Sequence, residues 1–356
     1  MIRKIKDITL QIIAGANAAT VAAMLLTGYS DRVNPAEHPV LANAGLLFPV
    51  FLAACACFLV FFLFTKKKYA LVSLAGFVIG YQPIRNYWPL NVKRDVPPGA
   101  LKVLSYNVHN FQPDSPPEDT PNPILDYILN SDADIVCLQE ARLDKALLDK
   151  AKDVYGYCDS VFHPGRGDCL VLMSKFPILA KDRIEYKSKA NLSAAFKVKI
   201  NSDTVTVVNN HFESTGLSLA DRAGFRQMVK GEAGKDTMKA ESRRLARKLG
   251  ESVRIRAPQV DSVAAYVERC PYPVILCGDF NDSPISYAHR KLASTLTDCY
   301  VATGNGHGIS YHHNAFFVRI DNIMCSSHWT PYRCKVDRSA GYSDHYPIYC
   351  WLKKRE

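Results

Sequence analysis

Polar side chains that can bind a metal ion or transfer a proton stand at the ends of apolar, strand-like segments of this 356-residue chain. Because the ends of adjacent strands lie side by side, residues far apart in the sequence can converge there. Carboxylates, amides and imidazoles are all represented. The set comprises Asn107, Glu140, His211, Asp279, Asn281, Asp321, Asp344 and His345.

These side chains favour one kind of metal and one kind of chemistry. Hard oxygen ligands suit Mg²⁺ or Mn²⁺, and too few cysteines and histidines converge for a zinc site. The eleven cysteines include no CxxC spacing, and several interrupt strand-like runs as small apolar residues do. Carboxylates, imidazoles and a divalent metal can together activate water, neutralise phosphoryl charge and assist a leaving oxygen. The set therefore indicates phosphoester hydrolysis.

The elements that must position these residues are expected between residues 101 and 352. Apolar strand-like segments alternate there with polar turns, and residues 122–130 fit a helix. Two prolines and a glycine at 97–99 mark a boundary just before the first strand. We therefore expect a soluble α/β catalytic domain over residues 97–356, preceded by a separate unit over residues 1–96.

The first unit carries two long uncharged runs, residues 8–30 and 39–65, and a shorter one, residues 69–84. A bilayer crossing needs roughly 20 apolar residues, so the first two are predicted to span and the third is marginal. None of these runs contains an acidic or basic residue, which argues against a transport pathway through them. We predict a membrane anchor of two or three helices.

The side of the membrane depends on the third run. Basic clusters at residues 3–6 and 66–68 flank the two spans, and such clusters stay in the cytoplasm. If residues 69–84 cross as well, the catalytic domain lies outside the cytoplasm; if they lie in the interface, it is cytoplasmic. We favour the first arrangement, a multi-pass inner-membrane protein with an extracytoplasmic catalytic domain.

A long helical stretch between residues 221 and 269 contributes to the net charge of +10. A charge run on a helix is most often a solvated face. Contact with anionic lipid head groups or with a nucleic-acid backbone is the functional alternative. The basic residues of its middle part are Arg243, Arg244, Arg247, Lys248, Arg254 and Arg256.

Six short motifs resemble those of the endonuclease/exonuclease/phosphatase superfamily, and in the same order. They are SYNVHNF, DIVCLQE, NNHFES, GDFND, RIDNIM and SDHYPI, and together they extend over nearly all of residues 101–352. The resemblance implies a DNase I-like four-layer α/β sandwich of two packed sheets, with the site at one end. With the apolar N-terminal runs, it indicates a membrane-anchored, bacterial-type member.

The resemblance also implies a role for each matching residue. Metal ligation falls to Glu140, with Asn107 beside it and Asp344 as a further carboxylate. Catalysis falls to the remaining five. Asp279 positions or deprotonates water, and Asn281 orients the phosphate. His211 contacts the phosphate or the leaving group, and His345 contacts a phosphoryl oxygen with Asp321 fixing its tautomer.

The function that follows is Mg²⁺- or Mn²⁺-dependent hydrolysis of a phosphodiester or phosphomonoester. The basic helix favours nucleic acid as the substrate, whereas the anchor favours a phospholipid or sphingolipid head group in the bilayer. The sequence leaves the oligomeric state open. The alternative is a catalytically silent membrane-bound scaffold, which predicts the loss of site residues, and none of the central ones is missing.

Overall fold

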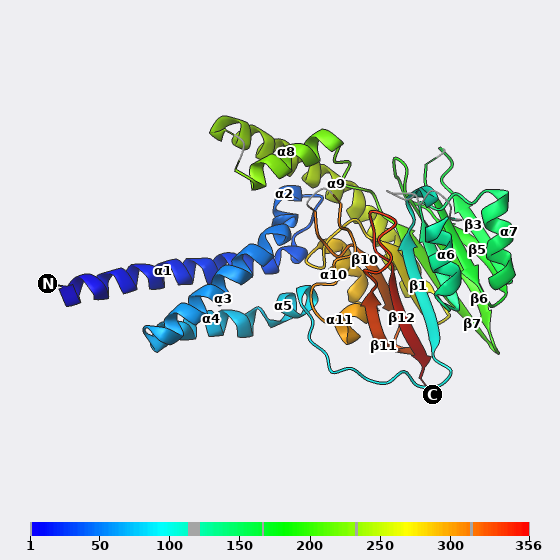
Figure 1. Ribbon diagram of the computed structural model, residues 1–356, viewed down its shortest axis with the longest axis horizontal. Coiled ribbons are helices and arrows are strands. Elements are labelled where there is room, and N and C mark those ends of the chain that lie inside the picture. Colours follow the sequence, from blue (N-terminus) through cyan, green and yellow to red (C-terminus); the bar gives the residue numbers. More distant parts are fainter. Residues whose placement is uncertain (1, 113–121, 166, 232–233, 314–315, 356) are drawn as a thin grey trace.

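The structure is a computed structural model that describes residues 2–112, 122–165, 167–231, 234–313 and 316–355. Helices of the N-terminal region extend from one end of a two-sheet domain (Figure 1). These are α1 (Ile2–Gly28), η1 (Ser30–Arg32), α2 (Pro39–Ala42), η2 (Ala44–Leu47), α3 (Phe48–Phe64), α4 (Lys67–Ile79) and α5 (Tyr81–Tyr87).

Two helical stretches in this region, Lys4–Arg32 and Pro39–Phe64, are long and apolar enough to cross a membrane. The second is not one regular helix, because the short turns α2 and η2 precede α3. The marginal third run divides at Gly80 into α4 and α5, and α4 has only 13 residues. Helices α1, α3 and α4 lie side by side (Figure 1).

The remaining chain forms two six-stranded sheets. The first has the order β11-β12-β1-β2-β4-β3, and the second has the order β5-β6-β7-β8-β10-β9. The strands are β1 (Leu101–Asn107), β2 (Ile135–Gln139), β3 (Tyr157–Phe162), β4 (Cys169–Ser174), β5 (Ile178–Ile184), β6 (Leu192–Ile200), β7 (Asp203–His211), β8 (Val274–Asp279), β9 (Thr297–Asp298), β10 (Asp321–Cys325), β11 (Trp329–Val336) and β12 (Ile348–Lys354).

Helices cover the outer face of each sheet. The helices of this domain are η3 (His109–Phe111), α6 (Pro123–Asn130), α7 (Lys145–Val154), α8 (Leu219–Val229), α9 (Lys235–Arg269), α10 (Tyr287–Ala293) and α11 (Cys299–Thr303). Side chains of α6 and α7 pack on the first sheet, and those of α9 and α10 pack on the second. Apolar residues of both sheets meet between them. The result is the expected four-layer DNase I-like sandwich.

Burial on both faces explains why the central strands read as continuous apolar runs. Every residue of β2 and β8 is buried, whereas β3 and most of β5, which lie at sheet edges, are partly or fully exposed. Strands β1 and β2 run parallel, as do β7 and β8. The carboxyl ends of these two pairs meet at one end of the sandwich, where Asn107 of β1 donates to Asp279 of β8.

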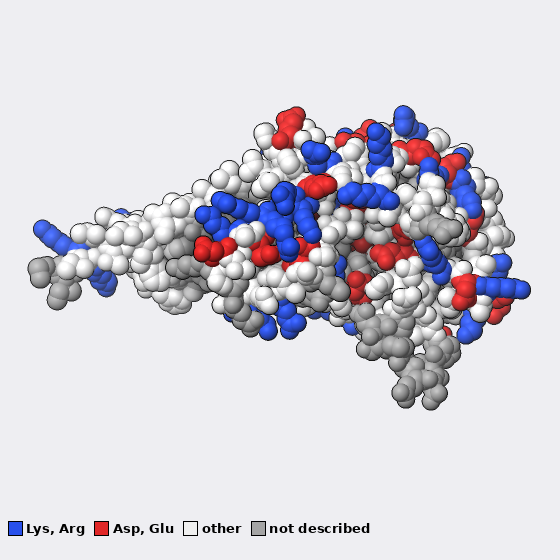
Figure 2. Space-filling model, turned by 90° about the horizontal axis from the view of Figure 1, so that it is seen from above, with Lys and Arg blue, Asp and Glu red and all other residues white. Residues whose placement is uncertain are grey.

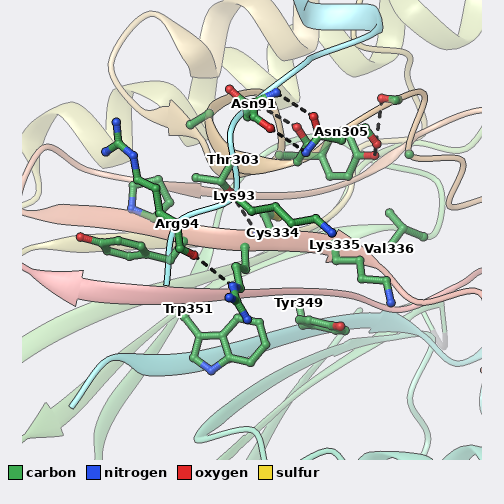
Figure 3. Close-up of a pocket in the computed structure, with 18 of the residues that line it drawn as sticks. Asn91, Lys93, Arg94, Thr303, Asn305, Cys334, Lys335, Val336, Tyr349 and Trp351 are labelled. Atoms are coloured by element: carbon green, nitrogen blue, oxygen red, sulfur yellow. Dashed lines mark hydrogen bonds between the residues drawn. The ribbon is translucent and has the colours of Figure 1, made fainter. Parts of the chain in front are cut away.

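The chain that joins the helices to β1 is attached to the surface of the catalytic domain. Asn91 donates from its backbone to Asn305 (2.7 Å) and from its side chain to the carbonyl of Gly304 (2.6 Å), as Figure 3 shows. Farther along, Arg333 donates to the carbonyl of Arg94 (3.0 Å). The buried Arg319 reaches back to the carbonyl of Asn86 (2.7 Å). These bonds fix the helices relative to the sandwich.

Candidate active site

The carboxyl ends of four strands bring the expected residues together. Asn107 ends β1, Glu140 directly follows β2, and His211 and Asp279 end β7 and β8. His211 and Asp279 are paired in register across the parallel strands, and Asp321 faces Asp279 from β10. Residues from both sheets therefore surround one point, although they are distributed over more than two hundred residues of sequence.

Asp279 lies at the centre of this cluster and is buried. One carboxylate oxygen accepts a hydrogen bond from the backbone of Asn281 (2.7 Å), and the other accepts one from the Asn107 amide (3.2 Å). Burial raises the pKa of Asp279 to about 6; the nearby His345 opposes this shift, and Asp321 adds to it. This carboxylate is suited to accept a proton near neutral pH.

His345 and Asp321 form a buried pair next to Asp279. Nδ1 of His345 lies 2.8 Å from Oδ2 of Asp321, and its Nε2 lies 3.7 Å from Oδ2 of Asp279. Burial disfavours the charged imidazole, but Asp321 and Asp279 outweigh it and raise the pKa of His345 to about 10. The ring is held as a donor with Nε2 toward the centre.

His211 has a carboxylate partner that the sequence analysis missed. Its Nδ1 lies 2.6 Å from Oδ2 of Asp168, while its Nε2 lies 3.6 Å from Asp279 and 3.9 Å from Glu140. Burial lowers the pKa of His211, but Asp168 and then the other two carboxylates overcome this effect and raise it to about 10. The centre thus contains two similar histidine–aspartate pairs, one from each side.

The signal for Asp168 was its place at the start of a strand. We expected site residues only at the ends of strands. Because β4 is antiparallel to β2, however, the beginning of β4 lies beside the end of β2. Asp168 also accepts from the backbone of Glu140 (3.0 Å). It therefore positions two residues of the centre.

Glu140 and Asn281 both adopt left-handed backbone conformations, each with φ of 50°. Such positions cost energy for residues other than glycine and concentrate at functional sites. In each case the chain turns sharply where a strand opens into the centre. Asn281 donates from its side chain to the carbonyl of Phe212 (3.0 Å), which holds the turn after β8 against the one after β7.

The donor set fits a divalent cation. Asp279, Asp321 and His345 offer ligand atoms that all lie within 4.8 Å of one another. The side chain of Glu140 is one-third exposed. Among the described residues, Glu140 and Asp279 form ion pairs with histidines. An excess of buried carboxylates over cations favours a bound metal ion.

The other expected metal ligands flank this cluster. Asn107 turns its amide nitrogen toward Glu140 (3.3 Å) and Asp279, and its oxygen accepts from the backbone of His109 (3.2 Å). Coordination by the Asn107 oxygen therefore requires the amide to turn over. Asp344 lies at the rim, with Oδ1 3.8 Å from Nδ1 of His109.

The centre opens into a pocket of about 280 Å³ that contains Glu140, His211, Asp279 and His345. A larger cavity of about 1450 Å³ lies beside the linker and β11 (Figure 3), and it contains none of the expected site residues. The volume of a cavity alone therefore does not identify the active site. The converging carboxylates and imidazoles identify it.

Two family models match parts of the chain. The model of the endonuclease/exonuclease/phosphatase family matches residues 104–345, and a model described as a domain of unknown function matches residues 10–87. No curated protein matched the chain.

Solved structures share the fold. An endonuclease/exonuclease/phosphatase from Beutenbergia cavernae superposes with a TM-score of 0.51 at 17% identity, covering 72% of each chain. The catalytic domain of human Nocturnin, solved with a bound sulfate anion, superposes with a TM-score of 0.50 at 15% identity, covering 74% of this chain and 97% of that one. The family model's match over residues 104–345 shows that the chain belongs to the endonuclease/exonuclease/phosphatase family, whose members generally hydrolyse phosphoester bonds with the help of divalent metals.

Proposed function

We propose that this protein hydrolyses a phosphodiester or phosphomonoester in a reaction that depends on Mg²⁺ or Mn²⁺. One observation carries the proposal: Asp279 lies between two imidazoles, His345 and His211, each held by its own aspartate. A carboxylate to accept a proton and two donors for phosphoryl oxygens are the groups that this reaction needs.

The metal is assigned to Glu140 as principal ligand, with Asn107 and Asp344 beside it. Bound there, Mg²⁺ or Mn²⁺ would neutralise charge on the phosphoryl oxygens and polarise the phosphorus. The one-third exposure of Glu140 leaves room for water and substrate oxygens, which Mg²⁺ usually keeps among its ligands.

The other residues of the centre transfer protons or contact the phosphate. Asp279 accepts a proton from water as the water oxygen bonds to phosphorus. The bond between phosphorus and the leaving oxygen breaks, and that oxygen keeps the electron pair and takes up a proton from His211 or from water. His345 donates to a phosphoryl oxygen, Asn281 orients the phosphate, and His211 contacts the phosphate or the leaving oxygen. Asp321 and Asp168 act through the imidazoles that they hold.

We further propose that residues 1–96 anchor the catalytic domain, residues 97–356, in the inner membrane. Lys66, between α3 and α4, pairs with Asp7 of α1 (2.6 Å). Both basic clusters therefore lie at the end of the helices that is remote from the sandwich (Figure 1). If the clusters face the cytoplasm, three passes leave the catalytic domain outside it. Fusions of a reporter enzyme to residue 356, active on one side only, test this topology.

The test of the proposed activity is metal-dependent turnover. The full chain, purified in detergent and stripped of metal with a chelator, is assayed with bis(p-nitrophenyl) phosphate and p-nitrophenyl phosphate. We expect turnover of at least one of them to appear on addition of Mg²⁺ or Mn²⁺ and to disappear on renewed chelation. A folded protein that binds Mn²⁺ but hydrolyses neither ester would contradict the proposal and favour a silent scaffold.

A further inference from the structure

The lining of the catalytic pocket includes an apolar wall in addition to the polar centre. Residues from α9, from the loop after β7 and from the segment before β10 supply this wall, and Leu46 of η2 completes it. Leu46 belongs to the short turns between α1 and α3, at the start of the apolar stretch Pro39–Phe64, so the candidate membrane region itself forms part of the active-site pocket. The apolar lining residues used below are Leu46, Leu249, Val253 and Phe316.

The short turns that contain Leu46 also expose apolar side chains that do not line the pocket. Val40, Leu41, Leu46 and Leu47 are between 43% and 58% exposed. Four such residues within eight positions, in the short turns between α1 and α3, are expected to lie at the surface of a bilayer. The rim of the pocket thus lies at the depth of lipid head groups.

The catalytic loop is joined directly to the N-terminal helices. Ile285, six residues after Asp279, is buried in a cluster with Met24 of α1 and Phe48 of α3. Gly45 lies so close that a Cβ there would fall 2.2 Å from the carbonyl oxygen of Ile285. The distance between the centre and the bilayer surface is therefore fixed by packing.

Cationic groups also line the pocket. Arg256 lines the pocket while fully buried; it binds Asp282 (2.6 Å) and the carbonyl of Glu213 (3.0 Å). Its remaining terminal nitrogen has no hydrogen-bond partner within the described residues. Arg222 also lines the pocket and donates to the hydroxyl of Tyr311 (2.6 Å). An anionic head group would supply a partner for this buried guanidinium.

A basic stripe lies next to the same rim. Gly250 of α9 packs against Pro39 of α2, with an added Cβ 3.4 Å from that proline. Lys239, Arg243, Arg247 and Arg254 are exposed and, at 3.6 residues per turn, share the face of α9 on which Gly250 lies. Figure 2 shows Lys and Arg side chains gathered where the helical extension meets the catalytic domain. Such a stripe attracts an anionic membrane surface.

We propose that the substrate is a bilayer-resident amphiphile, whose phosphoester head reaches Asp279 while its apolar chain lies along the wall between Leu46 and Phe316. This inference rests on the proposed hydrolase function and specifies the class of substrate for that site. A nucleic acid fits the observations less well, because it would place its charged backbone against the apolar wall and has no chain to cover it.

The test measures binding separately from turnover. The full chain is placed in phosphatidylcholine nanodiscs with Mg²⁺ and titrated calorimetrically with ethylphosphonate and dodecylphosphonate, which lack a hydrolysable ester bond. Heats from empty discs are subtracted. We expect dodecylphosphonate to bind at least about tenfold more tightly, since each buried methylene strengthens binding. Leu46→Gln should lower the ratio of the two affinities about fivefold. Leu179→Gln, at a leucine that is 57% exposed on β5, should leave the ratio unchanged.

Any of three results would overturn the proposal. One is a ratio near one in the wild-type chain, and another is a ratio that Leu46→Gln does not change. The third is tighter binding of a 5′-phosphorylated single-stranded oligodeoxynucleotide than of dodecylphosphonate. Failure of the hydrolase function looks different: chain-length-dependent binding would persist, but no phosphoester would be turned over in the presence of metal.

Discussion

The catalytic centre and the mouth of its pocket are built from different parts of the chain. The centre consists of strand ends from both sheets, with Asp279 between two histidine–aspartate pairs. The mouth combines α8, α9 and the loop before β10 with Leu46 from the N-terminal region. The centre contains the residues that the family motifs specify, whereas the mouth depends on a junction with the helices of this chain.

This difference separates what the protein does from what it acts on. Changes at the centre should reduce turnover of every phosphoester, because each substrate uses the same proton acceptor and donors. Changes at the mouth should mainly alter the preference between bilayer-borne and soluble substrates. Four sets of variants, with expected effects from the largest to the smallest, test whether the centre and the mouth have these separate roles.

Replacing His345 by glutamine should have the largest effect. The change removes a donor that faces Asp279, so we expect kcat to fall about 10²–10⁴-fold on soluble and bilayer-borne esters alike. Asp321→Asn should cause a smaller loss of the same kind, because the ring remains but its tautomer is no longer fixed. The exposed His328 provides the control variant His328→Gln. A loss of kcat on only one of the two classes of ester would contradict the claim that both react at the same catalytic centre.

Glu140→Gln should act through the metal. Losing one negative ligand weakens binding of the cation, so we expect the Mg²⁺ concentration for half-maximal turnover to rise at least roughly tenfold. Part of the lost kcat should return at saturating Mg²⁺. An unchanged metal requirement would remove Glu140 from the ligand set and point instead to the Asp279, Asp321 and His345 cluster.

Gly45→Ala tests the junction. An added Cβ would meet the backbone of Ile285 at 2.2 Å, so the two segments must separate, at a cost of about 1–3 kcal/mol. We expect the midpoint of thermal unfolding to fall by several degrees and the preference for bilayer-borne substrate to decrease. Gly15→Ala on α1 is the matched control, since no atom lies within 4 Å of its added Cβ. Equal melting temperatures would show that the junction is looser than its packing indicates.

Removing charge from α9 should have the smallest effect. Exposed cations near an anionic bilayer are attracted to its surface. In nanodiscs containing anionic lipid, we expect Arg243→Gln with Arg247→Gln to lower turnover of bilayer-borne substrate roughly threefold, and high salt should abolish the difference. The matched control exchanges Lys145 and Lys150, both exposed on α7, for glutamine. A similar loss on a soluble ester would place these arginines in the centre's chemistry instead.

The centre could largely be anticipated from sequence because its residues follow apolar strands. Strands β1, β2, β7 and β8 are almost entirely buried, and a polar side chain suited to chemistry stands at or directly after the end of each. The sheet edges were harder to predict. Strand β3 is partly or fully exposed throughout and lacks a clear pattern, and the apolar-rich run of residues 168–178 contains β4 and the start of β5, which lie in different sheets.

The mouth could not be predicted, because it depends on contacts between distant segments. No local pattern indicates that Leu46 lies in the pocket or that Ile285 is buried among the N-terminal helices. Composition did identify the apolar runs, but not the short turns before α3 that bring Leu46 to the pocket. Asp168 was overlooked for a related reason, since its role depends on the antiparallel pairing of β4 with β2.

The most direct test of the central claim compares Asp279→Asn with Asp182→Asn in the full chain. The first change keeps the shape of the side chain but replaces the carboxylate by an amide that cannot accept a proton, whereas Asp182 is exposed on β5. With saturating Mg²⁺ and bis(p-nitrophenyl) phosphate, we predict that Asp279→Asn lowers kcat about 10²–10⁴-fold and that Asp182→Asn has no effect. Equal turnover by both variants, with unchanged melting temperatures, would contradict the assignment of Asp279 as the proton acceptor at the centre.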